Sequence, residues 1–246
     1  MFNFNPSQYT ESFRDYESAY AYLDNGGIPT YKLIECSDQK KLIKPNLIDL
    51  ARLFKICRAI KPNRIIEYGC GFSSYIFNYY LSNFDINIDS KKQLHIIEVH
   101  RNYLQHALSR FEEGKINIDL TSEICPVILD TKRDDGSHKY LVDYKFTPDL
   151  IYLDGPDPAD ITNTKFTDGD QRVPISSDLL TIESWLIPGT VIIVDGRIAN
   201  VRYLKKNLQR EWHWNTSVDN DCSIGILNES PLGKKNLSNL KKRGLI

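Results

Sequence analysis

The chain has 246 residues, of which 41% are hydrophobic and 26% are charged. These are ordinary values for a soluble globular protein, and they exclude disorder over most of the length. The 31 Lys and Arg residues nearly balance the 32 Asp and Glu residues, which leaves a net charge of -1. Because no global positive field exists to attract DNA or RNA, we expect no nucleic-acid partner.

Cysteine usage and the first residues indicate the compartment. The cysteines are odd in number and scattered, without C-x-x-C or zinc-ligand spacing, so they indicate reduced, packed thiols; they are Cys36, Cys57, Cys70, Cys125 and Cys222. The N-terminus lacks the apolar core of a signal peptide, and no run approaches the length of a membrane span. We therefore predict a cytoplasmic protein without a membrane partner.

Residues 1–62 are predicted to form a helical cover. A Tyr-rich segment over 6–23 is followed by the Gly26-Gly27 break, and an amphipathic run over 45–60 is closed by Pro62. These aromatic helices are suited either to cover an active site or to form a homodimer surface, and the sequence leaves both open.

From Arg64 onward, short apolar runs alternate with helical stretches, as a doubly wound parallel sheet requires. The last strand follows Trp212 too closely for a crossover helix, which predicts an antiparallel ending. The expected fold is α/β, with a Rossmann-like, mainly parallel seven-stranded sheet and an antiparallel C-terminal hairpin. Strands are expected at 64–68, 93–99, 116–121, 149–154, 190–195 and 222–227, and helices at 74–82, 101–112, 174–186 and 198–210.

Two segments lie outside this alternation. Polar residues around Gly136, within the insertion at about 131–147, predict a mobile loop or a hairpin tip. Residues 229–246 carry a local basic run, which we expect to be a solvated tail. The central domain is accordingly placed at 63–228.

The most informative motif lies at residues 65–74, where an apolar strand leads into Glu67, Gly69, Gly71 and Ser73. The glycines allow positive φ and close approach of a ligand to the backbone, and a serine can cap the following helix. The motif differs from the dinucleotide fingerprint because Ser74 stands where its third glycine would fall. An ordinary strand-to-helix turn explains the same residues, so the rest of the chain must decide.

This order of acid, glycines and serine resembles the first motif of class I S-adenosylmethionine-dependent methyltransferases. The resemblance implies that Glu67, Gly69, Gly71 and Ser73 hold the methionine end of the cofactor. Glu98 ends the next strand about 30 residues later, where the family has an acid that accepts the ribose hydroxyls. The resemblance spans about residues 63–228.

Two further aspartates end neighbouring strands. Asp154 follows Leu150-Ile151-Tyr152-Leu153, and Asp195 follows Ile192-Ile193-Val194. With the Asp-Gly-Pro turn, this region resembles small-molecule methyltransferases of the catechol O-methyltransferase-like group. That group follows its second aspartate with asparagine to complete a magnesium site, whereas this chain has Gly196, so Mg²⁺ is not favoured and no metal ligand is assigned.

The implied reaction is methyl transfer from S-adenosylmethionine to a small-molecule or sugar acceptor, at oxygen, by in-line displacement. Asp154 is the first candidate for the general base and also a cofactor contact, and His138 is the second candidate for the base. Arg172, Asp195 and Arg197 are candidates for substrate binding.

Three alternatives remain. The segment Asp154-Gly155-Pro156-Asp157-Pro158 is similar to a motif of spermidine synthase-type aminopropyltransferases, which use decarboxylated S-adenosylmethionine. A non-catalytic binding or scaffold protein would keep the fold without turnover. A nicotinamide-dependent reductase is disfavoured by Ser74.

Overall fold

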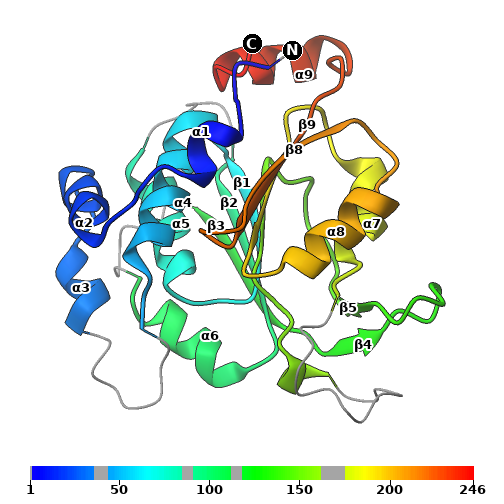
Figure 1. The fold of residues 1–246 in the computed structure, drawn as a ribbon, viewed down its shortest axis with the longest axis horizontal. Helices are drawn as coiled ribbons and strands as arrows, with labels where there is room; N and C mark the ends of the chain where they lie inside the picture. Colours follow the sequence, from blue (N-terminus) through cyan, green and yellow to red (C-terminus); the bar gives the residue numbers. More distant parts are fainter. Residues whose placement is uncertain (1, 36–43, 85–90, 112–117, 162–174) are drawn as a thin grey trace.

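The computed structural model describes residues 2–35, 44–84, 91–111, 118–161 and 175–246. One twisted sheet forms the centre, and helices cover both of its faces (Figure 1). Within the described residues, no helix is long and apolar enough to cross a membrane.

The predicted sheet is confirmed. It has seven strands in the order β3-β2-β1-β6-β7-β9-β8. The five strands from β3 to β7 in that order run parallel, and β9 pairs antiparallel with both β7 and β8. The strands are β1 (Arg64–Tyr68), β2 (Gln93–Glu98), β3 (Asp119–Ile124), β6 (Leu150–Leu153), β7 (Val191–Asp195), β8 (Trp212–Ser217) and β9 (Cys222–Leu227). The strand expected at 116–121 begins later, at Asp119, and positions 116–117 lie outside the described residues.

Alternation along the buried strands explains the three layers. Ile65 and Ile66 are both fully buried, but neighbouring residues of a strand point to opposite faces, so they join different cores. One core is formed with α4 (Leu47–Ile60), α5 (Phe72–Asn83) and α6 (Arg101–Leu108). The other is formed with α7 (Asp178–Ile182), extended by the 3₁₀ turn η4 (Glu183–Trp185), and α8 (Ile198–Asn207).

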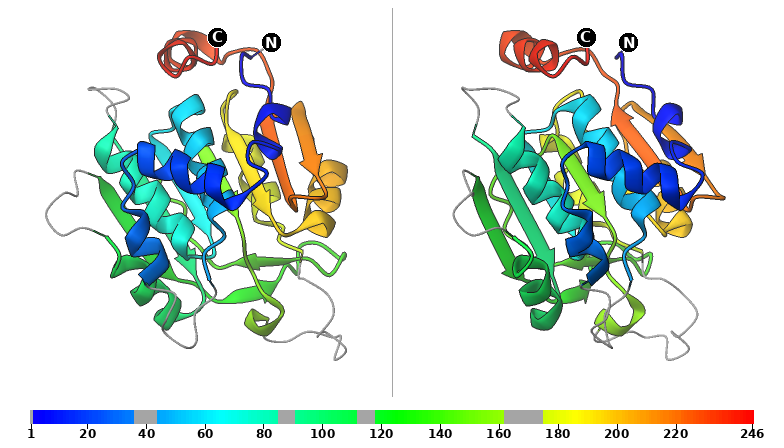
Figure 2. Two further views of the ribbon diagram at one scale, coloured as in Figure 1. Left: turned by 60° about the vertical axis from the view of Figure 1, so that its left-hand side comes forward. Right: turned by 90° about the vertical axis from the view of Figure 1, so that its left-hand side faces the viewer.

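The N-terminal cover consists of α1 (Ser7–Thr10), α2 (Tyr16–Asn25), α3 (Thr30–Glu35) and α4. Helix α2 packs on α4, outside the sheet (Figure 2). Helix α4 begins where the Asn46 side chain accepts the N–H of Ile48 and ends at Lys61 in the left-handed conformation. The expected break at Gly26-Gly27 separates α2 from α3, with Gly27 at φ +78°.

The expectation of a solvated C-terminal tail is wrong in part. Residues Gly233–Lys242 form helix α9, whose four lysines are exposed, but Arg243 just beyond it is fully buried. Its guanidinium donates to the carbonyl oxygens of Ile60 (2.9 Å) and Gly189 (3.1 Å) and pairs with Asp149 at 3.5 Å. A basic run does not reveal this burial because the single inward arginine looks the same as its solvated neighbours.

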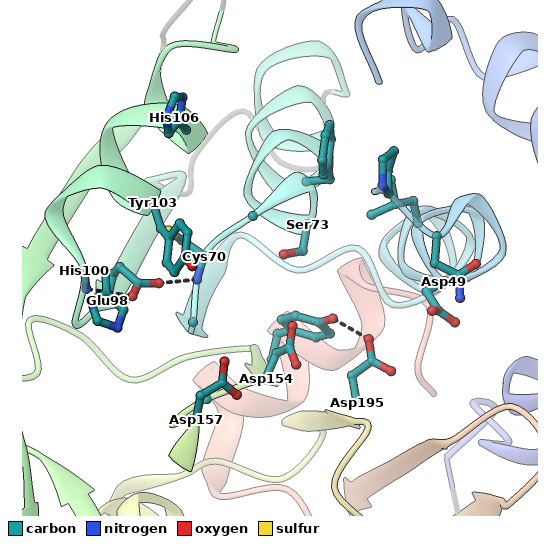
Figure 3. Close-up of a pocket in the computed structure, with 18 of the residues that line it drawn as sticks. Asp49, Cys70, Ser73, Glu98, His100, Tyr103, His106, Asp154, Asp157 and Asp195 are labelled. Atoms are coloured by element: carbon teal, nitrogen blue, oxygen red, sulfur yellow. Dashed lines mark hydrogen bonds between the residues drawn. The ribbon is translucent and has the colours of Figure 1, made fainter. Parts of the chain in front are cut away.

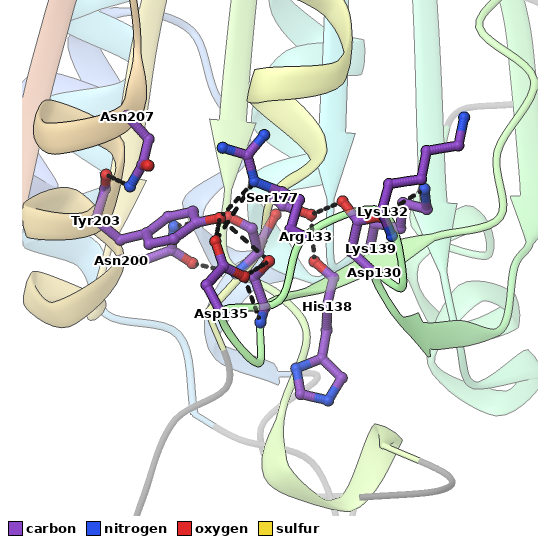
Figure 4. A network of polar contacts seen from close by, with 12 residues as sticks. Asp130, Lys132, Arg133, Asp135, His138, Lys139, Ser177, Asn200, Tyr203 and Asn207 are labelled. Atoms are coloured by element: carbon purple, nitrogen blue, oxygen red, sulfur yellow. Dashed lines mark hydrogen bonds and ion pairs between the residues drawn. The ribbon is translucent and has the colours of Figure 1, made fainter.

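The insertion forms a hairpin of β4 (Val127–Leu129) and β5 (His138–Tyr140). Side-chain contacts tie it to the α7/α8 face of the sheet (Figure 4). Ser177 donates to Asp130 at 2.8 Å, and Tyr203 of α8 donates to Asp135 at 2.7 Å. Of the two expectations, the hairpin tip is therefore confirmed.

Candidate functional site

A pocket of about 350 Å³ lies at the carboxyl ends of the parallel strands (Figure 3). The sheet order places it at the switch point, because the chain leaves β1 toward β2 on one side and later returns to β6 on the other. The ends of β1, β2, β6 and β7 and the turns after them supply much of its lining, and residues in and next to α4 and α6 and Tyr140 of β5 add to it. Its size suits a small organic ligand.

The two glycines after β1 have different roles. Gly69 has φ +81°, and a Cβ there would lie 3.0 Å from the carbonyl oxygen of Asp154. Gly71 has φ -177°, which any residue adopts, so the expectation of positive φ is wrong for this position. No atom lies within 4 Å of a Cβ built on Gly71, which lines the pocket. Gly69 thus serves the packing of two turns, whereas Gly71 leaves space for a ligand.

Glu67 lies beneath the pocket rather than on its surface. The side chain is fully buried, and one oxygen accepts a 2.5 Å hydrogen bond from Ser73, which lines the pocket. Burial raises the pKa of Glu67 to about 8, so the neutral acid dominates at pH 7. Its second oxygen, Oε2, has no hydrogen-bond partner among the described residues. Glu67 can therefore act on a ligand through Ser73.

Glu98 lies at the end of β2 and accepts hydrogen bonds from three backbone N–H groups. Its carboxylate accepts from Cys70 at 2.9 Å, from Val99 at 2.8 Å and from His100 at 2.9 Å. These bonds join the turn after β1 to the turn after β2. A carboxylate has about four acceptor sites, and these bonds use three of them, so Glu98, which lines the pocket, retains capacity for one ligand hydroxyl.

Asp154 and Asp195 face the same pocket from neighbouring strand ends (Figure 3). Asp154 is exposed to solvent where it lines the pocket, while the protein atoms around its carboxyl group desolvate it in part. This desolvation, followed by the nearby charge of Asp195, raises the pKa of Asp154 to about 8. Desolvation also raises the pKa of Asp195 to about 6, although Tyr152 donates to it at 2.6 Å.

Arg197 holds the turn that follows Asp154. It is only 4% exposed, and its guanidinium donates to the carbonyl oxygens of Pro156 (2.7 Å) and Asp154 (3.3 Å) and to the carboxylate of Asp157 (3.2 Å). These contacts occupy the side chain with the neighbouring turn after β6. We therefore assign Arg197 to positioning of the turn and not to substrate contact.

Two further candidates are not placed in this pocket. His138 is buried on β5 and does not line it; its ring extends away from the polar network of the hairpin (Figure 4). The prediction of His138 as a base is therefore not retained. Arg172 lies outside the described residues.

The structure adds pocket residues that the sequence analysis missed. His100 at the start of α6, Tyr103 within it and Arg110 just beyond its end line the pocket, and Asp49 lines it from the first turn of α4. His100 contacts Asp160 at 2.7 Å across the rim. Tyr103 and His106, three residues apart on one face of α6, both line the pocket, and the position of this helix directly after Glu98 was the available signal.

Acidic side chains dominate the pocket lining, among them Asp49, Glu98, Asp154, Asp157, Asp160 and Asp195, with Lys44 and Arg110 as cations. Within the described part of the chain, no group of three or more His, Cys, Asp or Glu side chains is arranged to hold a metal ion. The pocket thus offers a negative environment suited to a positively charged ligand.

No known protein-family profile and no curated protein sequence matches the chain. A search of solved structures finds similar folds among methyltransferases, and one aligns with a TM-score above 0.5. The methyltransferase PaMTH1 from Podospora anserina, solved with S-adenosylhomocysteine, aligns with a TM-score of 0.51 and 13% identity over 91% of this chain and 94% of that chain. An O-methyltransferase from Bacillus cereus, also solved with S-adenosylhomocysteine, aligns with a TM-score of 0.44 and 12% identity over 91% and 96%. The chain therefore has the Rossmann-like fold found in PaMTH1.

Proposed function

We propose that this protein transfers a methyl group from S-adenosylmethionine to an oxygen of a small-molecule acceptor. The observation that carries the proposal is the pocket at the β1/β6 switch point, where the open space at Gly71 meets the carboxylate of Glu98. The bound cofactor would supply an activated methyl group on a positively charged sulfur. The acidic lining favours that charge.

The residues present fit this cofactor. Glu98 would accept one ribose hydroxyl with the acceptor site that its three backbone bonds leave. The turn at Gly69 and Gly71, with Ser73 supported by Glu67, would hold the methionine end. The space next to Gly71 admits a ligand without meeting a side chain.

Asp154 is proposed as the general base. Methyl transfer to a hydroxyl needs removal of its proton, and a base is most effective when its pKa lies near the working pH. Desolvation and the charge of Asp195 raise the pKa of Asp154 toward that range. Asp195, fixed by Tyr152, is proposed to bind the acceptor beside it.

The first test is calorimetric titration with S-adenosylmethionine, its decarboxylated form, S-adenosylhomocysteine and NADH, each with and without Mg²⁺. We expect micromolar binding of S-adenosylmethionine and S-adenosylhomocysteine. Preference for decarboxylated S-adenosylmethionine would support the aminopropyltransferase alternative, which Asp154 and Asp157 at the pocket favour. Binding of NADH alone, or of none of the four, would refute the proposal.

The second test separates an enzyme from a non-catalytic binding protein. Incubation with S-adenosylmethionine and a mixture of hydroxylated small molecules should release S-adenosylhomocysteine in the wild-type protein. Asp154→Asn should bind both adenosyl ligands as the wild type does but release less product. Equal loss of binding and turnover would assign Asp154 to cofactor binding instead.

A further inference from the structure

A second cavity, of about 700 Å³, lies at the edge of the sheet opposite the proposed active site. Its lining residues come from the amino ends of the strands: Arg64 begins β1, Gln93 begins β2, and Asp149 immediately precedes β6. Helix α9 lines the cavity on its outer side. The two cavities therefore share no lining residue.

The lining of this cavity is cationic. Arg64, Lys91, Lys235 and Lys242 line it, against one carboxylate, Asp149. That carboxylate is already held between two arginines, because Arg64 pairs with it at 3.2 Å and the buried Arg243 approaches it at 3.5 Å. Asp149 therefore offsets little of the positive charge that a ligand would meet.

The two lysines of α9 supply the charge that no acid neutralises. Lys91 forms an ion pair with Asp119 at 2.7 Å, whereas no described carboxylate pairs with Lys235 or Lys242. They are seven residues apart, which is two turns, so they project from the same helix face into the cavity. Lys234 and Lys241 are also exposed on α9 but do not line it.

An unsatisfied hydrogen-bond acceptor on Asn63 is an independent feature of the same cavity. Asn63 is 3% exposed, and its side-chain oxygen Oδ1 is buried without a hydrogen-bond partner among the described residues. Asn63 lines the cavity together with Arg64. Because an unsatisfied buried acceptor is costly, a small rotation of the Asn63 amide toward the cavity, where its oxygen would meet a ligand O–H or N–H, would be stabilised.

We propose that this cavity binds a phosphate monoester of a sugar. Lys235, Lys242 and the outer edge of Arg64 would bind the phosphate, and Asn63 would accept a hydrogen bond from a sugar hydroxyl. The volume exceeds what a lone phosphate needs and suits a small organic ligand. The site is independent of methyl transfer, so it can be tested without S-adenosylmethionine.

The experiment is calorimetric titration of the whole chain with ribose 5-phosphate, adenosine 5′-monophosphate, inorganic phosphate and ribose. The double variant Lys235→Gln/Lys242→Gln should weaken the binding of ribose 5-phosphate about tenfold or more, because it removes two direct charge contacts. The matched control Lys234→Gln/Lys241→Gln removes the same charge from the same helix outside the cavity. It should weaken binding by less than about twofold, because salt screens the interaction of these exposed lysines with the ligand.

Asn63→Ala tests the donor contact separately. Its backbone N–H and carbonyl, which bond Asp149 and Gln93, are kept, so the fold should persist. Asn63→Ala should weaken the binding of ribose 5-phosphate more than the binding of inorganic phosphate. Equal weakening by the two lysine pairs, or no binding of any phosphorylated probe at millimolar concentration, would overturn the proposal. Binding only to RNA or anionic vesicles would overturn it too.

Discussion

Gly69 and Gly71 provide a pair of substitutions with opposite expected results. An alanine at position 69 would have to adopt the left-handed backbone conformation, at φ +81°. Its Cβ would lie 3.0 Å from the carbonyl oxygen and 3.1 Å from the carbonyl carbon of Asp154. A side chain at Gly71 meets neither constraint, because the backbone is extended and nothing lies within 4 Å. The first change should damage the fold and the second should damage only the pocket.

The magnitudes follow from these two environments. For Gly69→Ala, the left-handed conformation costs about 1–2 kcal/mol and the close contact about 1–3 kcal/mol, which together lower the unfolding free energy by about 2–5 kcal/mol. For Gly71→Val, the change should stay within about 1 kcal/mol, since Gly71 is an N-cap and an apolar side chain is somewhat disfavoured there.

The assays are urea denaturation for stability and calorimetry for S-adenosylhomocysteine. Gly71→Val should unfold near the wild-type midpoint but bind at least about tenfold more weakly, because its side chain fills ligand space. Unchanged binding by a folded Gly71→Val protein would refute the site assignment. Similar losses of stability in both variants would refute the assignment of different roles to the two glycines.

Three further predictions concern single carboxylates. Asp154→Asn should lower turnover by about 10²–10⁴-fold with unchanged cofactor affinity. In a pH–rate profile of the wild-type protein, turnover should rise as the pH approaches the raised Asp154 pKa of about 8. Because burial raises the pKa of Glu67, the folded state holds its proton more tightly than the unfolded chain; unfolding free energy should therefore fall as pH rises from about 4.5 to about 8. Glu67→Gln should remove that part of the decline in denaturation series, and an unchanged slope would contradict it. Asp149→Ala should cost about 3–5 kcal/mol in urea denaturation because Arg243 stays buried without its partner, and a cost below about 1 kcal/mol would count against this role.

The sheet could be predicted from the sequence because its signal is local. Four of the five parallel strands contain a short apolar run followed by an acid, as Ile65-Ile66 precede Glu67 and Ile192-Ile193-Val194 precede Asp195; β3 lacks such a run. Parallel topology then brings these ends to one edge, so the positions of Glu98, Asp154 and Asp195 at the pocket followed from strand order alone.

The errors arose where a role depends on long-range contacts. Whether Arg197 meets a substrate or the carbonyl of Pro156 is decided by how the turn folds back, which no local pattern encodes. The same applies to Glu67, which a pattern places at the pocket but packing places beneath Ser73. Arg243 is equally ambiguous, since its burial depends on Asp149, 94 residues earlier.

The turns around the pocket form one continuous chain of contacts. Glu98 holds the N–H of Cys70, Gly69 lies against the carbonyl of Asp154, and that carbonyl accepts from Arg197 at the start of α8. Rigidity of this kind is established on folding, so a ligand does not have to order these loops when it binds. The consequence is preorganisation: affinity should depend little on loop closure at these turns, and association should be fast and show a small entropic penalty. A substitution at Arg197 would then weaken ligand binding by loosening the turn that it holds, without removing any group that touches the ligand.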